Sequence, residues 1–174
     1  MLKFGSLSVI SLYILFSACG QTIQRNGQSS NKELKEPLIE ENKKQVKAEN
    51  QSIDQFIERR KWEMVETGTG LRYMIYQNGF GLNAETGMYA TVNYEISLID
   101  GTICYTSLEN GPRRFLIGKD NVESGIHEGI TYMKVGDKAK LIIPSYLAQG
   151  LVGDQNKIPP RATLIVDLHL TRLE

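Results

Sequence analysis

The sequence predicts an α+β fold, in which an antiparallel β-sheet wraps on one short α-helix and a short N-terminal helix precedes it. Three observations give this class. Between 71 and 170 the apolar residues recur mainly at alternate positions, as in strands with one buried face. Short turn signals separate these runs, which favours antiparallel neighbours, and a single run at helical spacing interrupts them. With 41% hydrophobic residues, the 174-residue chain can form one domain of ordinary size.

The clearest strand covers residues 91–98, where apolar and polar side chains alternate. One face of this strand is therefore expected to be core and the other wet. Asp100-Gly101 is a two-residue hairpin signal that returns the chain through 102–105. Further strands are expected from 71 to the turn at 78–79, over 114–117, over 138–143, and over 163–170 with Leu164, Val166, Leu168 and Leu170 inward and Asp167 and His169 outward.

Two segments have helical spacing instead. The apolar residues of 51–61 predict a short helix that packs at the edge of the domain. Those of 122–133 also fall on one side of a helix, which is expected to lie on the sheet. The folded domain is expected to cover 62–174.

The N-terminal residues 1–18 have the pattern of a signal peptide. Lys3 gives a positive start, and the apolar run over 7–16 is too short to cross a bilayer core, which needs about 20 residues. Ser17-Ala18 before Cys19 resembles the bacterial lipobox, in which the cysteine is lipidated and becomes the first mature residue. A permanent transmembrane helix and ordinary secretory cleavage, with Cys19 incidental, are the alternatives.

Residues 19–50 are expected to form a disordered tether behind the lipidated cysteine. From 20 to 50 the chain is rich in Gln, Asn, Lys, Glu and Ser, has no aromatic residue and has no sustained apolar period. Several acyl chains on Cys19 would hold the protein to a bilayer, since each buried methylene contributes about 0.8 kcal/mol. No acidic residue directly follows Cys19, which favours anchoring at the outer membrane, with the domain facing the periplasm.

Composition and motifs exclude several classes of function. Basic and acidic residues number 20 each, so no broad positive field would attract nucleic acid. The only histidines, His127 and His169, have no cysteine or histidine cluster around them, so we expect no metal site and no cofactor. The sequence has no nucleophile elbow, phosphate loop or dinucleotide fingerprint. Cys104 could be a nucleophile, but its place in a strand-like run is more typical of a small buried hydrophobe.

One enzymatic reaction needs neither a nucleophile nor a metal. Rotation about a prolyl amide has a barrier of about 18–20 kcal/mol, which comes from the double-bond character of the C–N bond. An apolar pocket that binds the twisted amide better than the planar one lowers this barrier. Hydrogen bonds that hold the flanking carbonyls complete such a site.

The order of motifs from 87 to 174 resembles the FKBP-type peptidyl-prolyl cis-trans isomerases, and this resemblance covers nearly the whole domain. It implies an FKBP-like fold and a prolyl isomerase acting on proline-containing polypeptides. The motifs that carry it are Val92-Asn93-Tyr94, Asp100-Gly101, Phe115-Leu116-Ile117-Gly118, Val122 with Gly125 and Glu128-Gly129, Met133 with Val135-Gly136-Asp137, Ala139-Lys140-Leu141, Ala148 with Gly150, Ile158-Pro159-Pro160 and Ala162-Thr163-Leu164.

The resemblance also assigns site residues. Tyr94 would be a pocket wall whose hydroxyl supports the substrate-binding network, and Ile158 an apolar wall. Glu123 stands where the family uses a backbone N–H to hold a substrate carbonyl, so its acidic side chain need not abolish that donor. The substrate-binding positions that it implies are Cys104, Tyr105, Val122, Ile126, Ala148 and Val166.

Several aromatic positions of the family pattern have changed. Ile126 replaces a tryptophan at the pocket floor, and Cys104-Tyr105 replace a Phe-Asp pair. The remaining replacements are Arg113 and Val166 for phenylalanines and Gln149 for a tyrosine. Because an aromatic ring buries roughly 150–250 Å², these losses favour weak turnover or, as the alternative, a non-catalytic chaperone or assembly module with a degenerate pocket.

The run from 122 to 129, with the lipoprotein signal ahead of it, is similar to the gliding-motility-associated FKBP-type lipoproteins of the Bacteroidota. This similarity implies an isomerase at the cell envelope that assists the folding of exported proteins and is anchored through Cys19. A purely structural lipoprotein is a further, weaker alternative.

Overall fold

The computed structural model describes residues 29–174. The predicted signal peptide, Cys19 and the first part of the predicted tether lie outside these residues. The chain divides into two units between Ile39 and Glu40, and the second unit, Glu40–Glu174, carries the sheet and both hydrophobic clusters. Within the described residues no helix is long and apolar enough to cross a membrane.

Seven strands of the described chain form one sheet in the order β1-β2-β6-β7-β3-β4, with β5 paired to β3 as well. Every pairing is antiparallel, which confirms the predicted class. The strands are β1 (Val65–Glu66), β2 (Arg72–Gln77), β3 (Tyr89–Leu98), β4 (Ile103–Thr106), β5 (Arg113–Leu116), β6 (Lys138–Ile143) and β7 (Leu164–Leu173). The helices are α1 (Ser29–Arg60), α2 (Ser107–Asn110) and α3 (Ser124–Ile130), with a 3-10 turn η1 (Ser145–Leu147).

The alternation read from the sequence describes β3 and β7 well. These two strands pair along their length, with Val92 opposite Leu170 and Ile96 opposite Val166. The four apolar residues predicted to face inward on β7 are all buried, whereas Asp167 and His169 are partly exposed. Strand β6 pairs with β7 on its other side, so these three strands form the centre of the sheet.

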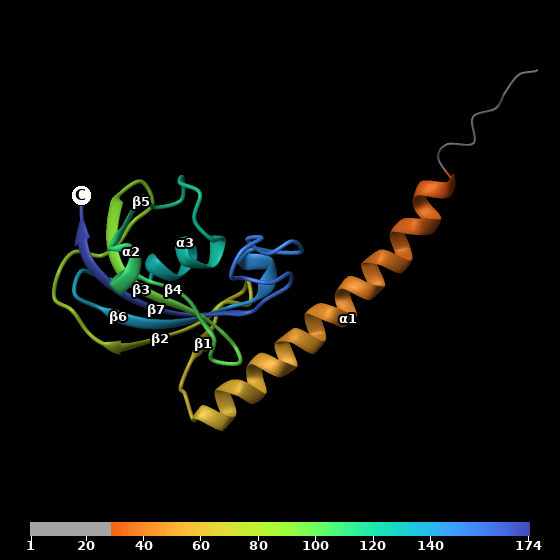
Figure 1. Cartoon of the computed structure of the whole chain (residues 1–174), viewed down its shortest axis with the longest axis horizontal. Coiled ribbons are helices and arrows are strands. Elements are labelled where there is room, and N and C mark those ends of the chain that lie inside the picture. The colour runs from red at the N-terminus through yellow and green to blue at the C-terminus, as the bar shows by residue number, and fades with distance from the viewer. Residues whose placement is uncertain (1–28) are drawn as a thin grey trace, which may run out of the picture. The chain divides into compact units, whose positions relative to one another are not determined.

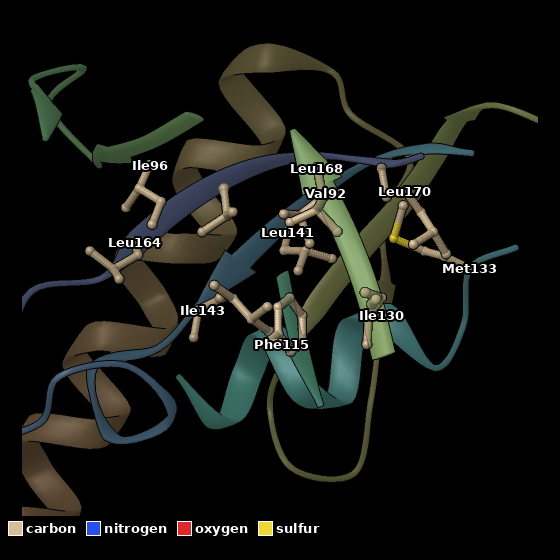
Figure 2. Packing of buried hydrophobic residues seen from close by; sticks show 14 of the residues in the cluster. Val92, Ile96, Phe115, Ile130, Met133, Leu141, Ile143, Leu164, Leu168 and Leu170 are labelled. Atoms are coloured by element: carbon tan, nitrogen blue, oxygen red, sulfur yellow. The ribbon is translucent and has the colours of Figure 1, made fainter. Parts of the chain in front are cut away.

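Helix α3 lies on one side of the sheet and encloses the main core with it (Figure 1). Gly129 allows this close approach, because a Cβ atom there would lie 2.6 Å from Cδ1 of Leu141 on β6. Figure 2 shows the side chains between the sheet and α3, among them Phe115 from β5 and Ile130 from α3. The predicted helix of 122–133 is shorter than expected, because only Ser124–Ile130 is α-helical.

Helix α1 corrects two predictions about the N-terminal region. The disordered tether is wrong for 29–50, because these residues belong to α1, and the helix expected at 51–61 is its C-terminal part. The segment lacks a strong apolar period, but Glu, Lys, Gln and Ala are good helix formers. Pairs along the surface add support, such as the 2.8 Å ion pair between Lys43 and Glu40.

The C-terminal part of α1 packs on the outer face of the central strands, away from α3, and not at the edge of the domain. Ile53 and Phe56 are buried there in a second cluster with Ile142 of β6 and Ile165 of β7. This helix therefore covers part of the face that was expected to be wet. Arg72, which should alternate outward on β2, is also buried, and its guanidinium donates to Asn50 and Asp54 of α1.

Candidate active site

A pocket of about 360 Å³ opens beside the main core, where the ends of several elements meet. Strand β3 provides Tyr94 and Ile96, and β4 provides Tyr105. The turn between α2 and β5 and the long connection between β6 and β7 complete the wall. The full lining is Tyr94, Ile96, Tyr105, Asn110, Gly111, Pro112, Arg113, Glu123, Gln149, Asp154 and Ile158.

Three predicted catalytic positions, Tyr94, Glu123 and Ile158, come together in this pocket. Tyr94 is half-buried and packs against the main core, because it alternates in phase with the buried residues Val92 and Ile96 on β3. Ile158 is buried and belongs to the core itself. The two side chains therefore give the pocket apolar walls that are continuous with the core.

Glu123 lies directly before α3, with a backbone φ of −53° and ψ of 133°. Its carbonyl accepts the first hydrogen bonds of the helix, from the N–H groups of Ile126 and His127 at 2.9 and 3.1 Å. The N–H of Glu123 itself donates no hydrogen bond to any other residue between 29 and 174. Among the described residues this N–H is therefore left available as a hydrogen-bond donor.

The side chain of Glu123 turns inward and is buried, and it links two walls of the pocket. Its Oε1 accepts a hydrogen bond of 2.8 Å from Nε2 of Gln149, and its Oε2 lies 3.5 Å from Nη1 of Arg113. No residue of the described chain donates a hydrogen bond to Oε2. This polar bridge occupies the part of the pocket where the family resemblance implies phenylalanine and tyrosine.

Asp154 organises the loop that carries Ile158. Its Oδ1 accepts hydrogen bonds from the N–H groups of Asn156 and Ile158 at 2.9 and 2.8 Å, and its Oδ2 accepts one from the Tyr105 hydroxyl. Desolvation acts to raise the pKa of this carboxyl, but the hydrogen bonds from Tyr105, Ile158 and Asn156 lower its pKa overall. The same contact with Asp154, followed by burial, raises the pKa of the Tyr105 hydroxyl.

Asp154 was not among the predicted site residues, although the sequence around it is typical of a turn. An aspartate two residues before an asparagine in a glycine-containing loop is typical of an Asx turn, which this one forms with Asn156. The lining also includes Asn110-Gly111-Pro112, a turn signal that was not among the predicted site residues. Ile96 was predicted as core and contributes to the pocket wall as well.

The predicted substrate-binding residues divide into two groups. Tyr105 lines the pocket, whereas Cys104, Val122, Ile126, Ala148 and Val166 do not. Cys104, Ile126 and Val166 lie in the core below it, and Val122 and Ala148 pack half-buried against that core. These five residues belong to, or pack against, the same core that Ile96 and Ile158 of the pocket lining join.

The buried thiol of Cys104 has no features of a nucleophile. Its Sγ lies 3.5 Å from the carbonyl oxygen of Lys157. Burial is the first cause that raises its pKa, followed by the charge of Asp154. Among the described residues no group of three or more His, Cys, Asp or Glu side chains could hold a metal ion.

Residues 81–171 match the family model of FKBP-type peptidyl-prolyl cis-trans isomerases. A protein of Neisseria meningitidis named probable FKBP-type peptidyl-prolyl cis-trans isomerase FkpA is 35% identical over 138 residues, which cover 78% of this chain and 50% of that protein. The present chain thus spans half the length of this relative. The peptidyl-prolyl cis-trans isomerase Fkbp12 of Drosophila melanogaster is 40% identical over 91 residues, covering 52% of this chain and 84% of that protein.

The fold agrees with these sequence relationships. The crystal structure of FkpA from Escherichia coli superposes with a TM-score of 0.64 and 29% sequence identity, over 91% of this chain and 74% of that chain. The structure of AtFKBP13 gives a TM-score of 0.61 with 28% identity, over 65% of this chain and all of the other. The FKBP-like fold expected from the motifs is confirmed. The chain belongs to the FKBP-type peptidyl-prolyl cis-trans isomerase family.

Proposed function

We propose that this protein catalyses cis-trans isomerisation of prolyl bonds in polypeptides, in the pocket between Tyr94, Glu123 and Ile158. The observation that carries the proposal is that Tyr94, Glu123 and Ile158 line one pocket, and that the backbone N–H of Glu123 donates to no other described residue. Family membership supports the same activity. The chemistry requires no covalent intermediate, so the absence of a reactive thiol at Cys104 is consistent with it.

The pocket can lower the rotational barrier in two ways. Ile96 and Ile158, with the ring of Tyr94, remove the proline from water, which otherwise stabilises the planar and dipolar amide. The N–H of Glu123 holds a substrate carbonyl, so that one side of the prolyl bond stays fixed while the other rotates. An interaction that is stronger in the twisted amide than in the planar amide accelerates the rotation.

A protease-coupled assay with a proline-containing chromogenic peptide tests this function. The wild-type protein should isomerise the peptide faster than the uncatalysed reaction, and Tyr94→Ala should reduce the rate. The substitution of an exposed tyrosine, Tyr132→Ala, provides a matched control away from the pocket. A wild-type rate equal to that of the peptide alone would remove the basis for the proposal.

The second candidate function is a binding module without turnover. The polar bridge between Arg113, Glu123 and Gln149 favours it, because it replaces the aromatic surface expected around a bound proline. Such a module would bind unfolded or partner polypeptide with an affinity that survives Tyr94→Phe. Binding of a proline peptide without any acceleration of its isomerisation would support this candidate over the first.

We propose further that residues 1–18 are a lipoprotein signal peptide, that Cys19 is lipidated, and that residues 62–174 form the isomerase domain at the cell envelope. The lipobox-like sequence before Cys19 supports the anchor. The run from 122 to 129 supports a role like that of the gliding-motility lipoproteins, at the outer membrane facing the periplasm. Cys19→Ala should abolish incorporation of radiolabelled fatty acid, and labelling that persists in this variant would contradict the anchor.

A further inference from the structure

The long connection between β6 and β7 supplies one wall of the pocket. Gln149, Asp154 and Ile158 all come from it. Its first residues form η1, and its last residue before β7 is Thr163. The position of these three lining side chains therefore depends on how the two ends of the connection are held.

A single carboxylate outside the sheet holds both ends. Oε1 of Glu49, on α1, accepts hydrogen bonds of 2.7 Å from the backbone N–H of Ser145 and from the hydroxyl of Thr163. Oε2 accepts a third hydrogen bond, of 3.0 Å, from the hydroxyl of Ser145. Thr163 is buried, and Glu49 is partly buried. Hydrogen bonds to a charged acceptor in such surroundings are stronger than those between neutral groups.

Glu49 is itself held in place by the packing of α1. One turn later, Ile53 is completely buried against Ile142 and Ile165, and the guanidinium of Arg72 donates to the adjacent Asn50 at 2.9 Å. The carboxylate of Glu49 is therefore carried by a fixed helix and contacts residues at the start and at the end of the connection between β6 and β7. This helix begins before the region from 81 to 171 that matches the family model.

We propose that Glu49 is a positioning residue for the isomerase pocket, acting through Ser145 and Thr163 on the loop that carries Asp154 and Ile158. The proposal rests on the proposed isomerase function. Without the carboxylate, the N–H of Ser145 and the hydroxyl of Thr163 lose their acceptor, and only the pairing of Ile143 with Leu164 still holds the two ends of the connection. The loop then samples positions in which Ile158 no longer faces Tyr94 and the N–H of Glu123.

The test compares Glu49→Ala with Glu58→Ala in the full chain. Both substitutions change the same residue type on α1, but Glu58 is exposed and lies more than two turns further along the helix than Glu49. Because a displacement of about 1 Å can cost up to about 100-fold in rate, Glu49→Ala should lower kcat/KM about ten- to hundredfold, and Glu58→Ala should leave it unchanged. Glu49→Gln, which keeps one oxygen acceptor, should fall between the two.

Hydrogen exchange provides a readout that does not depend on activity. In Glu49→Ala, exchange should accelerate over 145–163 while β3 and β7 keep wild-type protection. Thr163→Val should cause a smaller acceleration, and the double variant should not add to Glu49→Ala, because the two groups share one interaction.

The possible outcomes are distinct. Accelerated loop exchange with unchanged kcat/KM would overturn the proposal, because Glu49 would then stabilise the loop without serving the reaction. Unchanged loop exchange would overturn it as well. A wild-type protein without isomerase activity would instead contradict the proposed function, and the affinity of Glu49→Ala for a proline peptide, expected to fall about tenfold, would then test the positioning role.

Discussion

Each face of the central strands packs against a helix, but the two faces have different roles. Toward α3, Leu141, Ile143 and Val166 join a continuous core whose margin forms the pocket. Toward α1, Ile142 and Ile165 join a small cluster with Ile53 and Phe56. The first face builds the pocket, and the second holds the helix that carries Glu49. Helix α1 does not line the pocket, yet through Glu49 it contacts the connection that does.

The largest loss of stability is expected from a substitution in the core between the sheet and α3. Phe115 is buried in the main core and meets the ring of His127 edge to face at 5.6 Å. Phe115→Ala should lower the free energy of unfolding by about 3–5 kcal/mol, because it leaves a cavity that rigid strands cannot fill. Urea denaturation measures the change. Leu108→Ala, at a side chain that is 94% exposed, should leave the midpoint unchanged.

The face toward α1 should respond less strongly. Ile53→Ala should cost about 2–3 kcal/mol, at the lower end of the usual range, because the small cluster can relax around the cavity. Hydrogen exchange should show α1 opening while β6 and β7 stay protected. If the sheet lost protection together with α1, the two faces would not be separate in stability.

A smaller change in stability is expected from the titration of Asp154, in the connection between β6 and β7. The pKa of Asp154 is lowered in the folded protein from its usual value of 3.8, so ionised Asp154 stabilises the fold above that usual value, and this contribution is lost as the pH falls through the lowered pKa. Between about pH 5 and pH 3, unfolding free energy should therefore fall more steeply in wild type than in Asp154→Asn. Identical slopes in the two proteins would show that Asp154 contributes nothing to the loop.

Much of the fold could be predicted from alternation, but the role of α1 could not. Strand β6 was predicted with its observed bounds, yet Leu141-Ile142-Ile143 and Leu164-Ile165-Val166 are continuous apolar runs, which are typical of strands buried on both faces. These runs could have indicated a second covering element. The length of α1 was missed, because its polar segment has no apolar period and the helix is anchored in the core only near its C-terminal end, by Ile53 and Phe56.

The site was predictable where it depends on local sequence and unpredictable where it depends on distant contacts. Tyr94 and Ile158 were assigned to the pocket by the resemblance to the family, and the structure brings them together. Ile126 and Val166 lie in the core and not on the pocket lining, and a buried apolar residue has the same sequence pattern whether it lines a cavity or lies beneath it. The contacts of Glu49 join residues that lie 96 and 114 positions apart, and no local signal marks them.

The central claim is that the pocket isomerises prolyl bonds, and NMR exchange spectroscopy on a proline peptide tests it most directly. Uncatalysed exchange between the cis and trans forms takes tens of seconds or longer. A substoichiometric amount of the protein should produce exchange cross-peaks between the two forms within about a second. Cis and trans signals that exchange no faster with the protein than without it would contradict the account.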